Sequence, residues 1–260
     1  MEDRRFSIVR ANQLYLGPRR GRLGTLVSEK DLFPRYTLET FESDPITCVK
    51  AGGIALGTTG AENNMCLGSN MFEYHILGAG QTILAPSLVA TGLLASLDLV
   101  NNEGCEISQG ILARSKQAMV IGTDEFFFKC KFSIATVGGT DDCAVGFRKA
   151  EDYQANIDDY QDMAVLNVIS GTITIETMVG GAGTVPTSTT DAWADGETHT
   201  LEVYVSKAGV VTYKIDGAAP TVVAAYTFTD ALTVIPFFYF LHATTSPGNI
   251  ILQEWECGLQ

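Results

Sequence analysis

The chain has few charged residues for its size. Charged residues make up 18% of its 260 positions and hydrophobic residues 46%, whereas an ordinary domain carries roughly 25% charged residues. A disordered chain or a long solvated coiled coil needs far more charge, so neither describes this sequence. The length is sufficient for one large β domain with a sizeable core.

Histidine is also scarce, which limits acid–base and metal chemistry. The three histidines are His75, His199 and His242, and the chain has no G-x-S-x-G, H-E-x-x-H or G-x-x-x-x-G-K-[ST] motif. His199 enters a predicted strand, where a hydrogen-bonded structural role is favoured over a catalytic one. We therefore predict no catalytic residues and a protein that is not an enzyme.

The six cysteines include no C-x-x-C pair, which excludes the usual zinc and thioredoxin patterns. Their neighbours are apolar, as expected for free thiols that pack as small hydrophobic groups. The N-terminal sequence MEDRRFSIVR lacks an apolar signal-peptide run, so we expect folding in a reducing cytosol. The uncharged stretch 76–97 contains too much glycine and proline for a spanning helix, and no membrane contact is expected.

Positive charge is concentrated at the N-terminus. The whole chain has a net charge of −13, yet residues 1–22 hold six arginines and only two acids. The acidic remainder disfavours nucleic acid as a partner and favours docking of a basic arm on an acidic protein surface. The predicted partner-binding residues of this arm are Arg4, Arg5, Arg10, Arg19, Arg20 and Arg22.

Acidic side chains cluster in three predicted loops. None of these clusters matches an EF-hand, so no metal site is predicted, and Ca²⁺ is left open as the one cofactor that such loops could hold. Glu254 and Glu256 share the wet face of a predicted strand, which does not by itself indicate a catalytic pair. The clusters are Asp141 with Asp142, Asp158 with Asp159 and Asp162, and Asp191 with Asp195.

Alternation of apolar and polar residues is the main structural signal. Over 126–134, five apolar residues share one face and two lysines lie on the other, which predicts a strand with one buried face. Residues 201–206 and 211–215 predict a hairpin with a turn at 207–209. Further strands are expected at 164–169, 172–178, 222–228, 233–242 and 250–256, giving an antiparallel sandwich. The segment 150–160 is predicted as a short helix or a polar loop.

These patterns divide the chain into three parts. We predict a basic N-terminal arm over 1–35, an irregular Gly-rich segment of short strands over 36–84, and a β-sandwich over 85–260. The fold class is therefore all-β.

Two stretches of the third part resemble a known family. Residues 193–206 (WADGETHTLEVYVS) and 209–217 (GVVTYKIDG) are similar to the strand pair of concanavalin A-like, laminin G-like jelly rolls. Together with 126–134, 145–149, 234–238 and 255–260, they also resemble jelly-roll modules of tailed-phage virions. The resemblance implies an antiparallel jelly-roll β-sandwich over about 85–260.

The resemblance also implies a function. The leading hypothesis is a phage virion structural protein, a capsid decoration or cement protein made in the host cytoplasm, whose partners are sister copies or the major capsid protein in a homo-oligomer or lattice. The alternative is a glycan-binding adhesive module on a tail or head fibre, with Tyr153, Tyr160 and Trp193 as sugar-stacking residues. A glycoside hydrolase or lyase is the least favoured, because the Glu-x-Asp-x-x-Glu and Glu-x-Asp-x-Glu strand motifs of such enzymes are absent.

Overall fold

The computed structural model describes eleven stretches of the chain. They are residues 6–10, 13–16, 36–40, 46–49, 62–67, 70–77, 87–89, 92–96, 103–109, 118–242 and 249–260. Regular structure in them consists of β-strands and two short 3₁₀ turns, and none of their segments is a helix long and apolar enough to cross a membrane.

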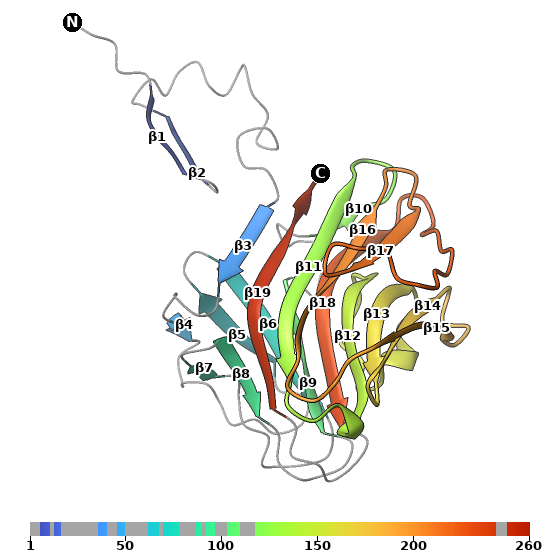
Figure 1. The fold of residues 1–260 in the computed structure, drawn as a ribbon. Helices are drawn as coiled ribbons and strands as arrows, with labels where there is room; N and C mark the ends of the chain where they lie inside the picture. Colours follow the sequence, from blue (N-terminus) through green and yellow to red (C-terminus); the bar gives the residue numbers. More distant parts are fainter. Residues whose placement is uncertain are drawn as a thin grey trace, which may run out of the picture.

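Two antiparallel sheets form the body of the protein (Figure 1). The ten-stranded sheet follows the order β15-β14-β13-β12-β18-β9-β6-β5-β4, with β10 paired to β18. Its strands are β4 (Ile46–Val49), β5 (Glu62–Leu67), β6 (Asn70–Leu77), β9 (Gly104–Ser108), β10 (Met119–Val120), β12 (Thr140–Lys149), β13 (Met163–Ile169), β14 (Thr172–Met178), β15 (Val185–Ala192) and β18 (Thr233–His242).

The seven-stranded sheet follows the order β17-β16-β11-β19-β8-β7, with β3 paired to β19. Figure 1 shows it in front of the strands of the ten-stranded sheet. Its strands are β3 (Tyr36–Thr40), β7 (Ser87–Val89), β8 (Gly92–Ser96), β11 (Phe126–Ile134), β16 (Thr198–Val205), β17 (Val211–Ile215) and β19 (Asn249–Leu259). The predicted antiparallel jelly-roll β-sandwich is confirmed by this arrangement.

The alternation seen in the sequence explains how each strand faces the core. On β11, Phe128 and Phe132 are fully buried between the sheets, whereas Lys129 lies on the outer face and is partly exposed. Phe128 packs on Trp255 of β19 at a ring-centroid distance of 4.3 Å, and Phe132 packs on Phe238 of β18 at 5.3 Å. Large aromatic rings from both sheets thus join the two layers.

The β16–β17 hairpin depends on two turns with left-handed backbone. Gly209 has φ +83°, and a Cβ there would lie 2.5 Å from the carbonyl oxygen of Phe228, so only glycine fits at this position. At the far end, Asp216 and Gly217 have φ of +50° and +83°, as two-residue hairpin turns require. Both predicted turns are therefore confirmed.

Two predicted segments are resolved by the structure. Of the two alternatives for residues 150–160, the helix is wrong and the loop is confirmed, because only Ile157–Asp159 (η3) makes a single 3₁₀ turn within an irregular segment. Residues 222–228 form no strand, and their one ladder contact is the isolated bridge from Val210 to Thr227. The second 3₁₀ turn, at Val137–Gly139 (η2), precedes β12.

Several strands of the N-terminal third belong to the same two sheets. β4, β5 and β6 extend the ten-stranded sheet, and β3, β7 and β8 belong to the seven-stranded one. A separate two-stranded sheet is formed by β1 (Phe6–Arg10) and β2 (Gln13–Leu16). Of the six predicted arm residues, Arg10 lies within β1, where only its backbone is described. The other five, Arg4, Arg5, Arg19, Arg20 and Arg22, lie outside the described residues. The division of the chain into an arm over 1–35, a Gly-rich segment over 36–84 and a β-sandwich over 85–260 remains a prediction.

Candidate functional site

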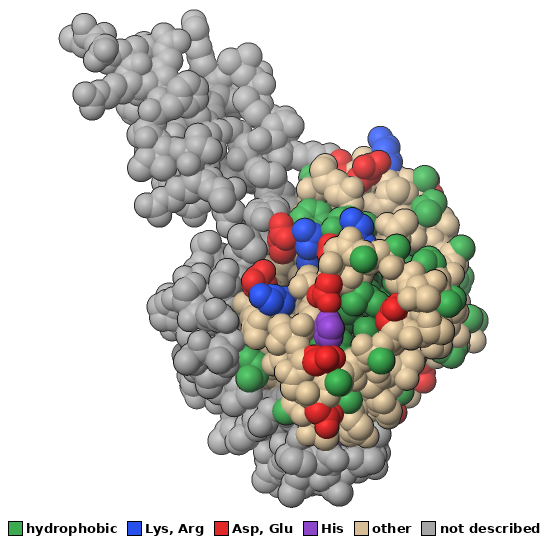
Figure 2. All heavy atoms as spheres, viewed as in Figure 1, with side chains coloured by type: hydrophobic (Ala, Val, Ile, Leu, Met, Phe, Trp, Pro, Cys, Tyr) green, Lys and Arg blue, Asp and Glu red, His purple; other side chains and the backbone are tan. Residues whose placement is uncertain are grey.

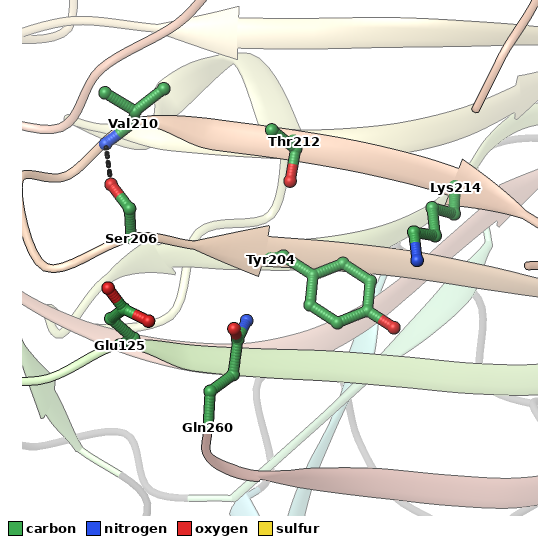
Figure 3. Close-up of a pocket in the computed structure, with 7 residues that line it drawn as sticks. All are labelled: Glu125, Tyr204, Ser206, Val210, Thr212, Lys214 and Gln260. Atoms are coloured by element: carbon green, nitrogen blue, oxygen red, sulfur yellow. Dashed lines mark hydrogen bonds between the residues drawn. The ribbon is translucent and has the colours of Figure 1, made fainter. Parts of the chain in front are cut away.

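A shallow hollow of about 310 Å³ opens on the outer face of the seven-stranded sheet. It lies where the β16–β17 hairpin meets the start of β11 and the C-terminal residue (Figure 3). Most of the side chains around it are polar, with one aromatic ring among them. The lining residues are Glu125, Tyr204, Ser206, Val210, Thr212, Lys214 and Gln260.

Tyr204 provides the floor of the hollow. It occupies an outward position of β16, and its ring lies along the strand with one face turned toward the viewer in Figure 3. Its hydroxyl donates a hydrogen bond to Glu202, and its ring lies 5.9 Å from that of Phe127 on β11. Burial and the bond to Glu202 raise the pKa of Tyr204, so the phenol stays protonated. The ring is therefore held in place on the outer face of the sheet, where it is partly exposed.

Charged side chains of both signs lie on this face of the molecule (Figure 2). Lys129 and Glu256 form an ion pair at 3.1 Å, and Lys131 and Glu254 form one at 3.3 Å. The predicted wet face of 254–256 is confirmed, and both glutamates serve cross-strand pairs. Lys214 instead lies over the Tyr204 ring, 5.0 Å from its centroid.

The outer face of the ten-stranded sheet has a different character. Arg148 of β12 and Glu106 of β9 form an ion pair at 2.6 Å with both side chains fully buried. The Tyr160 hydroxyl donates to the other oxygen of Glu106, and its ring lies 4.4 Å from the guanidinium carbon. Burial alone would lower the pKa of Arg148, but the charge of Glu106 and the bond to it raise it. This cluster fastens the segment 150–162 onto the sheet.

Two further carboxylates lie on that face. The Asn167 side-chain amide donates to Asp142 at 2.6 Å and to Glu176 at 2.9 Å, and its oxygen accepts from the Cys143 backbone at 2.7 Å. Burial raises the pKa of Asp142 to about 7, opposed by the Asn167 bond and assisted by the charge of Glu176. Burial also raises the pKa of Glu176. Asp142 is therefore partly protonated near neutral pH.

His199 has the structural role that its position predicted. Its Nδ1 lies 2.6 Å from Asp216 and its Nε2 lies 3.2 Å from Glu197, so it links the start of β16 to the Asp216–Gly217 turn. Partial burial lowers its pKa, but the two carboxylates raise it above the usual value. The ring also meets Trp193 edge-on at 4.6 Å.

Two of the three predicted sugar-stacking residues are in the core. Trp193 is 2% exposed, packs on Phe132, and donates its Nε1 hydrogen to the Glu197 carbonyl. Tyr160 is fully buried over Arg148. Neither ring presents a face on which a sugar could stack. Tyr153 is half-buried and stacks on the His75 ring at 4.5 Å.

Part of the predicted loop placement of the acidic clusters is wrong, because Asp141 and Asp142 lie in β12 and Asp191 lies in β15. Asp191 accepts two hydrogen bonds from Thr221, and Asp162 accepts one from the Gly180 backbone. Within the described ranges, no group of three or more His, Cys, Asp or Glu side chains could hold a metal ion. The prediction of free thiols is confirmed for four buried cysteines, Cys105, Cys130, Cys143 and Cys257.

Tyr204 was not among the site residues predicted from the sequence, although it lines the hollow. The alternation of 201–206 does place it on the wet face of its strand, between Glu202 and Ser206. A large aromatic residue at such a position is the available signal, because that face normally carries polar side chains.

Comparison with known proteins gives a likeness of shape only. No protein-family model and no curated protein matches the chain. Solved structures similar to it include an alginate lyase from Pseudomonas aeruginosa, with a TM-score of 0.47 and 12% identity over 66% of this chain and 84% of that one. The potassium-bound carbohydrate recognition domain of Emp46p gives a TM-score of 0.49 and 10% identity over 71% and 88% of the two chains.

A carbohydrate-binding module from Bacillus subtilis gives a TM-score of 0.46 and 10% identity over 71% of this chain and 94% of that one. With TM-scores below 0.5 and such low identities, these similarities say nothing about the ligand or activity of this chain.

Proposed function

We propose that this chain is a non-enzymatic glycan-binding β-sandwich whose binding site is the hollow around Tyr204. The observation that carries the proposal is a partly exposed aromatic ring, set in a hollow whose other lining groups are mostly polar. Of the functions considered from the sequence, this is the adhesive alternative, relocated to a different residue.

The chemistry of the hollow suits a sugar ring. The C–H groups of a pyranose are weakly positive and pack well on the negative face of an aromatic ring. Hydroxyl groups at the rim of the same sugar need partners, and Glu125, Ser206, Thr212 and Gln260 supply acceptors and donors around Tyr204. A wholly apolar ligand would leave these polar groups without partners.

The absence of enzymatic activity is part of the proposal and stays a prediction. Within the hollow, the phenol of Tyr204 is held protonated, which suits hydrogen bonding rather than proton abstraction. The buried Arg148–Glu106 pair lies on the other sheet beneath Tyr160. Its two charged groups bind each other, and Glu106 also accepts the Tyr160 hydroxyl. Incubation of the protein with any bound glycan should release no fragment or unsaturated product.

A glycan array tests the proposal directly. The intact protein should bind a defined subset of glycans, and Tyr204→Ala should remove that binding while the protein stays folded. Tyr153→Ala is the matched control, since Tyr153 is also a half-buried tyrosine but lies against His75 on the other sheet. An intact protein that binds no glycan, or Tyr204→Ala protein that binds like the wild type, would refute the proposed site.

The virion location is a separate prediction and is compatible with glycan binding. It rests on the sequence resemblance and on the basic arm, and purified phage particles should contain the chain in high copy. Deleting residues 1–22 should leave a folded sandwich that attaches poorly to particles, because arginine pairs with acidic protein surface would be lost. Equal attachment of the shortened and full chains would contradict the docking role of the arm.

A further inference from the structure

Two lysines on the outer face of the seven-stranded sheet lie over aromatic rings in nearly the same way. Lys129 lies 5.1 Å from the Phe127 ring centroid, and Lys214 lies 5.0 Å from that of Tyr204. The Lys129 charge is also neutralised by Glu256 at 3.1 Å. No described carboxylate forms an ion pair with Lys214.

The carboxylate best placed to pair with Lys214 is otherwise engaged. Glu202 faces Lys214 across the β16–β17 ladder, but it accepts the Tyr204 hydroxyl and is only 6% exposed. The Lys214 ammonium therefore lies at the rim of the hollow without an ion pair to a described carboxylate. A second anion can approach it from solvent without displacing an existing pair.

The hollow is also polarised along its length. Figure 3 shows Lys214 at one end and Glu125 at the other, with Tyr204 and Gln260 between them. The Lys214 ammonium lies over the Tyr204 ring, 5.0 Å from its centroid, and near the hydroxyl end of that ring in the view of Figure 3. A ligand that bridges the two ends needs an anionic group at one side and hydroxyl donors at the other.

We infer that the hollow binds a saccharide unit bearing an anionic substituent, a carboxylate or a sulfate, with the sugar ring on Tyr204 and the anion at Lys214. This inference rests on the proposed glycan-binding function and adds the class of ligand. The flexible stem of Lys214 allows its ammonium to move from over the aromatic ring to the anionic substituent, so that the sugar ring packs about 4 Å from the aromatic ring. Hydroxyl groups at the opposite end donate to Glu125 and bond to Gln260.

The experiment compares glycans that differ only in charge. The probes are trimers of galacturonate, glucuronate and mannuronate with their neutral methyl esters, and a sulfated galactose trimer with its unsulfated form. Titration calorimetry with the intact protein should show at least one acid or sulfate binding about tenfold more tightly than its neutral counterpart. Added salt should reduce that preference.

Matched lysine variants separate this inference from a general charge effect. Lys214→Met should remove the preference for the charged glycan, whereas Lys129→Met should keep it. Comparison of the affinities for the uronate trimers and for the sulfated galactose trimer identifies whether the site prefers a carboxylate or a sulfate. Equal binding of charged and neutral glycans, or an equal loss of preference in Lys129→Met, would overturn the inference.

The proposed function has its own point of failure in the same experiment. If charged and neutral glycans bind equally well and Tyr204→Ala removes that binding, the function stands and only the anionic preference is wrong. If no glycan binds, or if binding survives Tyr204→Ala, the function itself fails.

Discussion

The outer faces of the two sheets use similar side chains for opposite purposes. On the ten-stranded sheet, Arg148, Glu106 and Tyr160 form a closed cluster with no exposed side-chain surface. On the seven-stranded sheet, Lys214 and Tyr204 also bring a cation to an aromatic ring, but they line an open hollow. The same residue types therefore stabilise the fold on one face and are available to a ligand on the other.

Coverage by the chain makes the difference. The segment 150–162 lies over the ten-stranded sheet, and its Ile157 and Tyr160 pack with Met163, Phe237 and Tyr239 in a second apolar cluster outside the main core. Around the hollow, the chain instead turns back at Gly209, and mostly polar groups surround Tyr204. Substitutions on the covered face should act on stability, and those around the hollow on binding.

The largest effect on stability is expected from Arg148→Met. It leaves the Glu106 carboxylate buried without its cation, which costs about 3–5 kcal/mol in the free energy of unfolding. Urea denaturation measures this loss. The double variant Arg148→Met with Glu106→Gln should recover part of it, and a loss below about 1 kcal/mol in the single variant would mean that the pair does not fasten the segment.

Trp193→Ala should also cost about 3–5 kcal/mol, because a large buried ring is removed from the core. The same variant retains the hollow around Tyr204, so glycan binding should persist at temperatures where the protein is still folded. Thermal unfolding and binding are measured on one sample. Loss of binding by fully folded Trp193→Ala protein would restore Trp193 as a ligand residue.

An intermediate effect on stability is expected from the titration of the Asp142 carboxylate and from its removal in Asp142→Asn. Its pKa of about 7 in the folded protein is above the unfolded value, so the folded state binds the proton more tightly. Stability should therefore be greatest in acid and fall as the pH rises through about 7. Asp142→Asn should flatten this dependence and raise the free energy of unfolding at pH 8 by about 2 kcal/mol.

Asp141→Asn is the control for that pH profile, since Asp141 is an exposed neighbour on the same strand. It should change the profile only slightly. A wild-type protein whose stability rises between pH 5 and pH 8 would show that the Asp142 site does not retain its proton.

The smallest effect on stability is expected from Lys129→Met on the open face. The Lys129–Glu256 pair is partly exposed, so its loss should cost no more than about 1 kcal/mol. Chemical denaturation of Lys129→Met and Arg148→Met under the same conditions compares the free energies of unfolding lost with the two ion pairs. Similar costs for the two lost ion pairs would remove the distinction between the faces.

Much of the fold was accessible from the sequence, because alternation depends on local pattern. The strand at 126–134 has the predicted bounds, and the hairpin at 201–215 has both predicted turns. The stripe at 150–160 misled, because Ile157 and Tyr160 are spaced as on a helix but are buried by packing on a sheet. The sheet surface on which they pack is formed by strands distant in the sequence, so no local pattern reveals it.

The candidate site was accessible only in part, for a related reason. The outward position of Tyr204 follows from alternation, but the hollow combines it with Glu125 and Gln260. These residues come from three separate segments, and only strand order brings them together. Tyr160 and Trp193 looked like loop aromatics, and the contacts that bury them come from strands remote in sequence.

Mapping a bound glycan by NMR tests the central claim most directly. Titration of a glycan selected from the array into ¹⁵N-labelled protein reports which backbone amides sense the ligand. We predict that the largest shifts fall on residues 204, 206, 212, 214 and 260 around the hollow. Shifts concentrated instead at Tyr153 and the segment 150–162 would contradict the account and place the site on the ten-stranded sheet.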